Sequence, residues 1–539
     1  MTRAGRQDIQ RLDRGLLYLC AAVLGLFILY PTVRLCVQAF QLWNYDALTR
    51  GDGLQSIINT LVLCFASVLG AAIFGTLLAW GVSRYTFPGR NALAALAYLP
   101  FALPPLVGVL SFYYLIGRDG VITRLLETLP GVEDAALNGF GAILLIHVYS
   151  FYVFFYAMVG AAIEGMDRAQ IEAARSLGAG RMRVFWKVAL PQLRPALLGA
   201  SLLTFMSSGA SFSAPYYFGR GFPVLSVQIF NERSQSHHDA ALTLTIVLAA
   251  LSLLGILLFR SRQRSTGGGS KGVRSPIRSA AGRTFASILA WSCMGLLLLP
   301  HLSIIYFSFV DHHAWYNEIL PTAFTTGNYS AIFSNANSFA PIRNSLWMSL
   351  VAAFFTVLIG VPAAYLIGRR RRGGVWINAL VMIPWALPGT VIAINLIVAF
   401  NDPWMPGSII ILWLPMAYFV RSIPMLTRMA AATIEPFDGQ LLEAGQSLGA
   451  SRGYCFRHIV LPLIAPALAA ATALVFATSL GEFVASILLY QPGNKPIAVE
   501  INSIFRSSVG AAFAYSVLLM MLVAGSFALS RRFSPRILG

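Results

Sequence analysis

The sequence predicts an all-α polytopic membrane protein with about 12 transmembrane helices, arranged as two homologous six-helix halves. Three observations support this prediction: the composition, roughly a dozen long apolar stretches, and an internal repeat. Hydrophobic residues make up 57% of the chain and charged residues only 11%, and the mean hydropathy is +0.69. Soluble domains carry about 25% charged residues, so this chain has too few charges to cover a water-facing surface.

The apolar stretches are long enough to cross a bilayer, because a spanning helix needs roughly 20 mostly apolar residues. In the first half we predict spans at about 15–40, 57–82, 92–117, 140–162, 194–212 and 241–259. In the second half we predict spans at about 286–310, 345–367, 376–400, 408–430, 463–489 and 512–530.

Basic residues gather in the loops on one side of this arrangement, as the positive-inside rule expects of cytoplasmic segments. They lie at both ends of the chain and in the loops after the second and fourth spans, and include Arg3, Arg6, Arg84, Arg90, Arg175, Arg369, Arg370, Arg531 and Arg532. Both termini are therefore predicted to be cytoplasmic. The net charge of +18 follows from this topology, so the expected surroundings are membrane lipid and no nucleic acid is expected as a partner.

A basic, flexible segment separates the two halves. From Arg260 to Arg283 the chain has seven basic residues, no acidic residue and a Ser-Thr-Gly-Gly-Gly-Ser run. Such a segment is typical of an extended tether, and an anchor on lipid headgroups is equally compatible with it. We therefore predict a first half at 1–260, a cytoplasmic linker at 261–284 and a second half at 285–539.

The most informative feature is a repeat in the loop after each fourth span, at about 164–194 and about 435–465. One copy reads Ile171-Glu-Ala-Ala-Arg-Ser-Leu-Gly-Ala-Gly and the other Leu442-Glu-Ala-Gly-Gln-Ser-Leu-Gly-Ala-Ser. Matching residues lie 271 positions apart, and the candidate site residues are Glu172, Ala173, Ala174, Gly178, Pro191, Glu443, Ala444, Gly449 and Pro462. An ordinary amphipathic surface helix would explain the basic residues but not this repeated spacing.

Each residue type in the repeat has a physical reason. Small alanines allow a helix to lie close to a partner surface, and the glutamate can pair with a cation there. Gly178 and Gly449 are expected to end the short helix, because glycine adopts the left-handed conformation of a helix C-cap readily. Pro191 and Pro462 are expected to start the next helix, where the missing N–H costs nothing.

The two copies resemble the cytoplasmic signature of binding-protein-dependent ABC importer permeases. Val188 replaces the usual isoleucine in the first copy, and Gly445 replaces the second alanine in the other, which could loosen that contact. The resemblance implies a bacterial inner-membrane permease in which each loop forms a coupling helix on a separate ABC ATPase, with two ATPase copies in all. It also implies a periplasmic or lipid-anchored substrate-binding protein as the second partner.

The chain itself lacks the sequence features of an ATPase or of another enzyme. A phosphate-binding loop needs Gly-Lys followed by Ser or Thr, and none of Lys187, Lys271 and Lys495 follows a glycine. No convergent catalytic set is present in the sequence, and the five cysteines form neither a disulfide framework nor a metal site. We therefore expect no catalytic residue, no bound metal and no cofactor in this chain, with ATP bound by the partner.

The cargo is indicated only weakly. Two fused halves resemble ferric-iron permeases and also thiamine permeases, and Ser479-Leu-Gly-Glu-Phe483 resembles a segment common to this group. An acid within a span is a functional candidate by default, so Glu482, with Ser211 in the matching position and Arg421 in the fourth span, is predicted to line the pathway. The alternative is a structural role for Glu482, either capping a helix or pairing with Arg421.

Three further interpretations concern His147, the proline pairs and the class of transporter. His147, inside a fourth span, is more often a satisfied packing histidine than a ligand. Pro100-Phe-Ala-Leu-Pro104 and Pro384-Trp-Ala-Leu-Pro388 are predicted to kink or break the third spans. Twelve spans in two similar halves also describe an ion-coupled secondary transporter, but few buried acid–base pairs are visible and the repeated loop has no role in that scheme.

Overall fold

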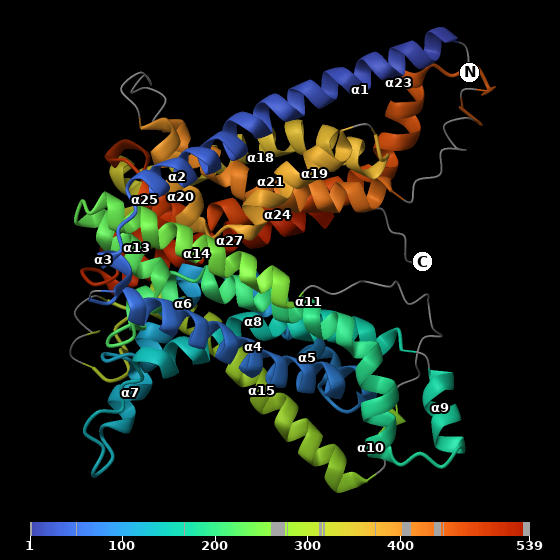
Figure 1. Ribbon diagram of the computed structural model, residues 1–539. Helices are drawn as coiled ribbons and strands as arrows, with labels where there is room; N and C mark the ends of the chain where they lie inside the picture. The colour runs from blue at the N-terminus through green and yellow to red at the C-terminus, as the bar shows by residue number, and fades with distance from the viewer. Residues whose placement is uncertain are drawn as a thin grey trace. The chain divides into compact units, whose positions relative to one another are not determined.

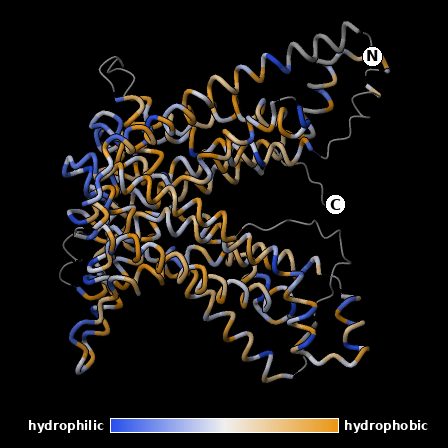
Figure 2. The backbone as a smooth tube through the Cα atoms, viewed as in Figure 1, coloured by the Kyte–Doolittle hydropathy of each residue, from blue (hydrophilic) through white to orange (hydrophobic). Residues whose placement is uncertain are grey.

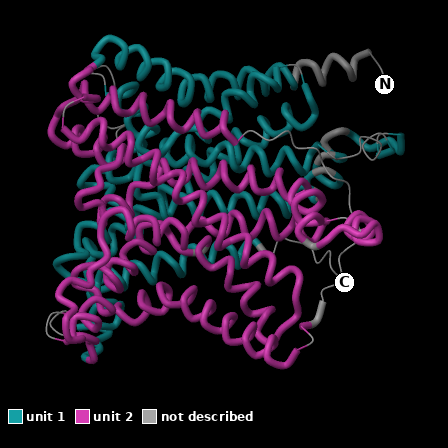
Figure 3. Tube along the Cα trace, turned by 60° about the horizontal axis from the view of Figure 1, so that its bottom comes forward, with its two compact units in different colours: residues 1–43, 308–312, 323–539 teal, residues 44–307, 313–322 magenta. Residues whose placement is uncertain are grey.

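A computed structural model describes residues 3–49, 51–166, 168–259, 275–277, 279–311, 315, 318–371, 373–401, 411–435, 444–445 and 447–531. Most of the predicted linker (261–274 and 278) and Glu443 lie outside the described residues. The chain divides into two compact units, shown in Figure 3: unit 1 comprises residues 1–43, 308–312 and 323–539, and unit 2 comprises residues 44–307 and 313–322.

Helices make up most of the described chain (Figure 1). Unit 2 contains α3 (Asp46–Thr49), α4 (Gly53–Arg84), α5 (Arg90–Leu96), η2 (Leu99–Ala102), α6 (Pro105–Ile116), α7 (Val121–Leu126), α8 (Gly139–Glu164), α9 (Arg168–Ser176), α10 (Arg181–Val184), η3 (Phe185–Ala189), α11 (Leu190–Gly209), α12 (Ser213–Phe218), α13 (Leu225–Ser234), α14 (His238–Phe259) and most of α15 (Ala280–Ser308). Two short parallel strands, β1 (Tyr85–Thr86) and β2 (Ser275–Pro276), pair with each other.

Unit 1 repeats much of this order. It contains α1 (Arg3–Leu24), η1 (Gly25–Leu29), α2 (Tyr30–Gln41), α17 (Gly327–Ser334), α18 (Ala336–Gly368), α19 (Gly374–Ala386), α20 (Gly389–Phe400), α21 (Trp413–Ile434), α23 (Arg452–Cys455), η5 (Phe456–Val460), α24 (Leu461–Leu480), α25 (Val484–Leu489), η6 (Pro492–Asn494), α26 (Ile497–Ile504) and α27 (Val509–Arg531).

The units do not follow the chain order of the two halves, because each half contributes its first helix to the other unit. Cys20 and Leu24 of α1 are buried in one core with Met348 and Ile359 of α18. In unit 2, α15 takes the corresponding place: Met294 is buried in one core with Tyr152 of α8 and neighbouring residues of α4. The boundaries at 260 and 285 therefore describe the sequence repeat, while the packed units exchange their first helices.

The prediction of a polytopic helical membrane protein is confirmed. Within the described residues, nine helices are long and apolar enough to cross a membrane, and hydrophobic residues run along these helices in Figure 2. The pair α19 and α20 adds a tenth candidate that is bent by 112°. Two further predicted spans are α21, which contains Arg421 and Arg428, and α24, whose apolar part is Ile464–Leu480.

The bend in the predicted third spans lies where the proline pairs are. In unit 1, α19 ends at Ala386 and α20 begins at Gly389, so Pro388 falls in the break. In unit 2, α5, the 3-10 turn η2 and α6 replace one continuous helix, and Pro104 precedes α6. Proline lacks an N–H and clashes with the preceding turn, so the prediction that these helices are broken is confirmed.

The second and fourth spans of each half cross at a glycine. A side chain on Gly75 of α4 would meet the backbone oxygen of Tyr152 at 2.4 Å, and one on Gly360 of α18 would meet Leu426 at 2.6 Å. Small residues allow membrane helices to approach closely and gain van der Waals contact. The same crossing is therefore used twice, once in each unit.

The expectation that Pro191 and Pro462 start a helix holds for the α-helical segments, since each proline is the second residue of its element, α11 or α24, but neither segment begins at a free helix end. Both lie inside continuous helices, α10–η3–α11 and α23–η5–α24, two residues after a five-residue π-helical turn. Pro31 stands in the same relation to η1. A π turn widens the helix so that the N–H of Leu190 bonds to the oxygen of Phe185, which relieves the clash that a proline ring makes with the carbonyl four residues earlier.

Candidate functional site

The first repeated loop folds as a short helix with a closed end. Glu172, Ala173 and Ala174 lie on α9, and Glu172 and Ala173 are exposed. Gly178 follows with φ +79°, and the N–H of Ala179 donates to the oxygen of Ala174 at 3.0 Å. This is the six-residue bond of a Schellman cap, so the predicted left-handed glycine is confirmed.

The second repeated loop has the same cap. Ala444 and Gly445 are helical, Gly449 has φ +84°, and the N–H of Ala450 donates to the oxygen of Gly445 at 3.1 Å. Because both caps use the same bond at matched positions, the two loops present the same local geometry.

Sequence reasoning missed the residue before each of these glycines. Leu177 and Leu448 have exposed fractions of 88% and 89%, so the two leucines are exposed to nearly the same extent. The available signal was a leucine repeated within an otherwise small and polar segment. In each loop the exposed leucine beside the Schellman cap is an apolar side chain that a partner can cover.

Internal packing explains why position 445 is a glycine. A side chain there would lie 3.0 Å from the sulfur of Cys455 and 3.1 Å from Ile459, and Cys455 is fully buried. Position 445 therefore faces the chain's own helix η5, so the change from alanine to glycine at this position adjusts internal packing, while Leu448 faces outward.

The predicted pathway residues of the second half meet in unit 1. The Nε of Arg421 on α21 lies 2.7 Å from Oε2 of Glu482, which is 6% exposed. The other oxygen of Glu482 accepts a hydrogen bond from the N–H of Ala485 at 3.0 Å, which satisfies a donor at the start of α25. Arg421 also lies against Gly389 of the broken third span. Glu482 therefore makes both contacts of its structural interpretation: it pairs with Arg421 and it caps the start of α25.

The matching position in unit 2 belongs to a neutral cluster. Nε2 of His147 lies 2.9 Å from Oγ of Ser211, and its Nδ1 lies 2.9 Å from Ser67 and 3.1 Å from Ser208. His147 is 1% exposed, which agrees with its interpretation as a satisfied packing histidine. Ser211 replaces Glu482, and the buried histidine replaces Tyr418, which hydrogen-bonds Ser486 at 2.8 Å.

In each unit, one continuous helix runs from the repeated loop to the buried cluster of that unit. In unit 2 the helix from Arg181 to Gly209 begins within the first loop, three residues after Gly178, and ends two residues before Ser211. Gln192 on this helix donates to Gln170 of α9 at 3.2 Å. In unit 1 the helix from Arg452 to Leu480 runs from the second loop to Glu482. Within the part of the chain that the structure describes, no cluster of three metal-ligating side chains is present.

These features define the chain as a polytopic membrane protein with two matched exposed loops, from each of which one helix runs to a buried cluster. The chain belongs to the family of binding-protein-dependent transport system inner membrane components, whose model matches residues 71–265 and 356–539. It is a permease of the ABC importer type and an integral inner-membrane protein.

Relatives in bacteria agree with this assignment. A probable ABC transporter permease protein y4fN of Sinorhizobium fredii is 28% identical over 93% of this chain and 92% of its own length. The ferric transport system permease protein FbpB of Actinobacillus pleuropneumoniae is 28% identical over 92% of this chain and 75% of its own. The sulfate transport system permease protein CysT of Salmonella typhimurium is 32% identical, but over 46% of this chain and 88% of its own.

Proposed function

We propose that this chain forms the membrane pathway of an importer for ferric iron and that two copies of an ABC ATPase dock on its two loops. The observation that carries the proposal is the duplicated loop, with the same cap, the same left-handed glycine and the same exposed leucine in both copies. A single chain then supplies both docking sites. ATP is bound by the partner, and this chain needs no resident cofactor or metal.

The docked residues in this proposal are Leu177 with Glu172, Ala173 and Gly178 in the first loop, and Leu448 with Ala444 and Gly449 in the second. Glu443, which lies outside the described residues, is assigned to the second contact by the repeat. The ATPase moves the loop, the helix that starts within the loop carries the motion inward, and the buried cluster at the far end of that helix responds. The chain contributes the pathway and the two helices that transmit the motion, and it carries out no covalent chemistry.

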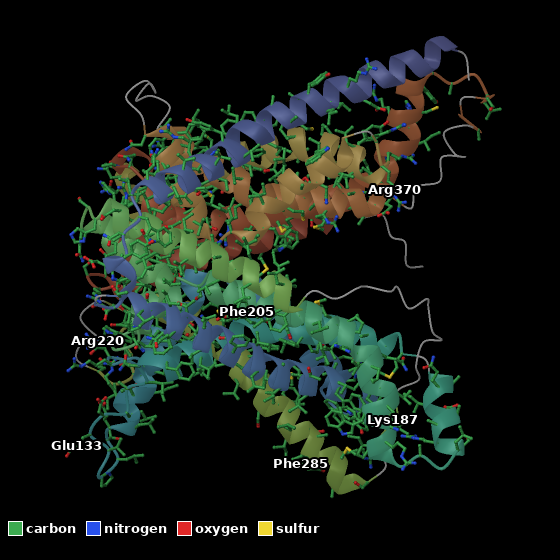
Figure 4. All side chains as sticks on the ribbon, in the orientation of Figure 1. Glu133, Lys187, Phe205, Arg220, Phe285 and Arg370 are labelled. Atoms are coloured by element: carbon green, nitrogen blue, oxygen red, sulfur yellow. The ribbon has the colours of Figure 1, made fainter. Side chains whose placement is uncertain are left out.

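The proposed topology places both termini and both loops in the cytoplasm, because the basic residues gather there. In Figure 4, Lys187 lies at one end of unit 2, while Glu133 and Arg220 lie at the opposite end. We assign the end with Glu133 and Arg220 to the periplasm, where a substrate-binding protein delivers the cargo.

Ferric iron is supported as cargo by relatives that extend over both halves of the chain and are named ferric transport permeases. Sulfate is the second candidate, since the sulfate permease aligns with less than half of the chain but at 32% identity. Arg421, with a side chain that is 40% exposed, is the feature that would suit an anion. Glu482 and Ser211 remain proposed pathway residues for either cargo, and thiamine or another small solute is the remaining alternative.

The test is uptake by proteoliposomes that contain this chain, its native ATPase and its native binding protein, with labelled ferric iron or labelled sulfate outside. ATP-dependent accumulation of iron alone supports the proposal. Accumulation of sulfate alone replaces the cargo and keeps the permease, and uptake without ATP would contradict the proposed mechanism. A variant with aspartate at positions 177 and 448 is the matched control, because it removes both docking leucines and leaves the pathway intact.

A further inference from the structure

A cavity of about 370 Å³ opens at the end of unit 2 that we assign to the periplasm. Its walls come from the start of α4, from the loop after α12 and from α13, and its polar lining residues are Asp52, Gln55, Gln228 and Asn231. At ~30 Å³ for each water molecule, this volume holds on the order of ten waters. It is large enough for one long side chain of a partner.

The polar lining of this cavity combines one carboxylate, that of Asp52, with three side-chain amides. Asp52 precedes α4 but makes no capping hydrogen bond to that helix. Two other lining residues each use one of their two amide N–H groups inside the protein: Gln55 donates to Asn59 at 2.8 Å, and Gln228 donates to Glu232 at 2.7 Å. The only charged group in the lining is the carboxylate of Asp52, and a carboxylate beside amide oxygens favours a cation that carries several N–H groups.

Two hydrogen bonds from one helix hold the edge of this cavity in unit 2, and the same two bonds recur in unit 1. We call this pair of hydrogen bonds the frame. Asn59 donates to the oxygen of Pro223 at 2.9 Å, and Thr60 accepts from the N–H of Leu225, the first residue of α13, at 3.0 Å. In unit 1, Asn344 donates to the oxygen of Lys495 at 3.1 Å, and Ser345 accepts from the N–H of Ile497, the first residue of α26, at 2.8 Å. Pro223 therefore corresponds to Lys495.

This correspondence shows what the frame holds in the other half. Gln228 is the fourth residue of α13, and Glu500 is the fourth residue of α26. The ammonium of Lys495 pairs with the carboxylate of Glu500. In unit 1 an internal lysine thus occupies the frame, whereas in unit 2 the matching position is a proline, which has no cation to offer, and the cavity is open.

We infer that the cavity of unit 2 receives a lysine or arginine side chain from the substrate-binding protein. The inference rests on the proposed topology and function, since it needs this end of unit 2 to face the binding protein. The cation supplied from outside takes the place that Lys495 takes in unit 1. It would orient the binding protein toward one half of the permease, because only that half leaves the frame open.

The experiment measures the affinity of the native binding protein for the complete transporter in nanodiscs. Asp52→Asn is expected to weaken binding about fivefold, and Asp52→Lys, which places a cation in the cavity, at least tenfold. Gln228→Glu copies Glu500 and is expected to tighten binding a few fold. Glu133→Lys is the matched control, because it makes the same charge change as Asp52→Lys on an exposed residue at the same end of unit 2 and is expected to change affinity less than twofold.

The outcomes separate this inference from the proposed function. Equal affinity for the wild type and both Asp52 variants overturns the inference, and so does a loss of uptake with unchanged affinity, since that result would make the cavity a site for a free cation. If the wild type does not bind the binding protein at all, both the inference and the proposed function fail. The opposite effects of Asp52→Lys and Gln228→Glu keep the test independent of a folding defect in either variant.

Discussion

Arg421 and Glu482 form an ion pair at 2.7 Å between the fourth span and the end of the fifth in unit 1. The carboxylate is almost fully buried, and its second oxygen receives the N–H of Ala485. A buried charge is stable only when it is paired and hydrogen-bonded. The pair therefore fixes the junction of three elements: α21, the end of α24 and the start of α25.

Removing one member of this pair is expected to harm the protein more than removing both. Arg421→Met leaves a buried carboxylate without its partner and should destabilise the transporter by about 1–3 kcal/mol. The double variant Arg421→Met with Glu482→Gln should recover at least half of that loss in thermal unfolding. The same preparations should be tested for uptake. A double variant that is stable but inactive would assign the Arg421–Glu482 pair a direct part in the pathway, whereas a stable, active one would make the pair structural.

Gly75 is expected to tolerate no side chain. Gly75→Ala places a methyl group against the backbone oxygen of Tyr152 and should lower stability by about 1–3 kcal/mol through overpacking. Gly81→Ala is the control on the same helix, since nothing lies within 4 Å of that position, and it should raise stability by about 0.5–1 kcal/mol. Thermal unfolding of both variants checks the prediction, and equal melting temperatures would refute the close crossing of α4 and α8.

His147 is expected to stabilise unit 2 through its hydrogen bonds to three serines. His147→Phe removes the partner of Ser211 and two further hydroxyl contacts, and should cost about 1–3 kcal/mol. Adding Ser211→Ala should restore part of the loss, because the unsatisfied hydroxyl is then removed as well. His237→Ala, at an exposed histidine of the same unit, is the control and should leave the melting temperature unchanged. A loss of transport without any loss of stability in His147→Phe would show that the cluster contacts cargo.

The left-handed glycine of the first loop is expected to be replaceable only at a cost. Gly178→Ala forces alanine to adopt φ +79° and should weaken the cap by about 1–2 kcal/mol. Gly180→Ala changes a nearby exposed glycine that does not have positive φ. Hydrogen exchange of the amides of Leu177 and Ala179 should rise roughly tenfold in Gly178→Ala and stay unchanged in Gly180→Ala. Equal exchange in the two variants would mean that the cap does not order the loop.

Sequence reasoning predicted the class of fold, the broken third spans and the left-handed glycines, because composition, proline pairs and a repeat with fixed spacing are local signals. It did not predict the exchange of first helices between units. Which unit α1 joins depends on packing partners such as Met348 and Ile359, which are hundreds of residues away in the chain. It also placed Pro191 at a free helix start, because the π turn that absorbs a proline inside a helix has no distinct sequence signal.

The site was predicted in part. The repeat identified both loops, but Leu177 and Leu448 emerged only from their exposure, since leucine in a membrane protein is usually expected to be buried. Glu482 and Arg421 were named separately, and their pairing required coordinates. The cluster of His147 with three serines could not be anticipated, because its members come from three helices and from the segment between α11 and α12, and none of them is unusual alone.

The central claim is that one chain offers two equivalent docking loops to two ATPase copies. Native mass spectrometry of the complex with its ATPase tests it directly, using the wild type, Leu177→Asp, Leu448→Asp and the double variant. The account predicts two ATPase copies for each wild-type chain, one for each single variant and none for the double variant. Two copies retained in the double variant, with the fold intact, would contradict it.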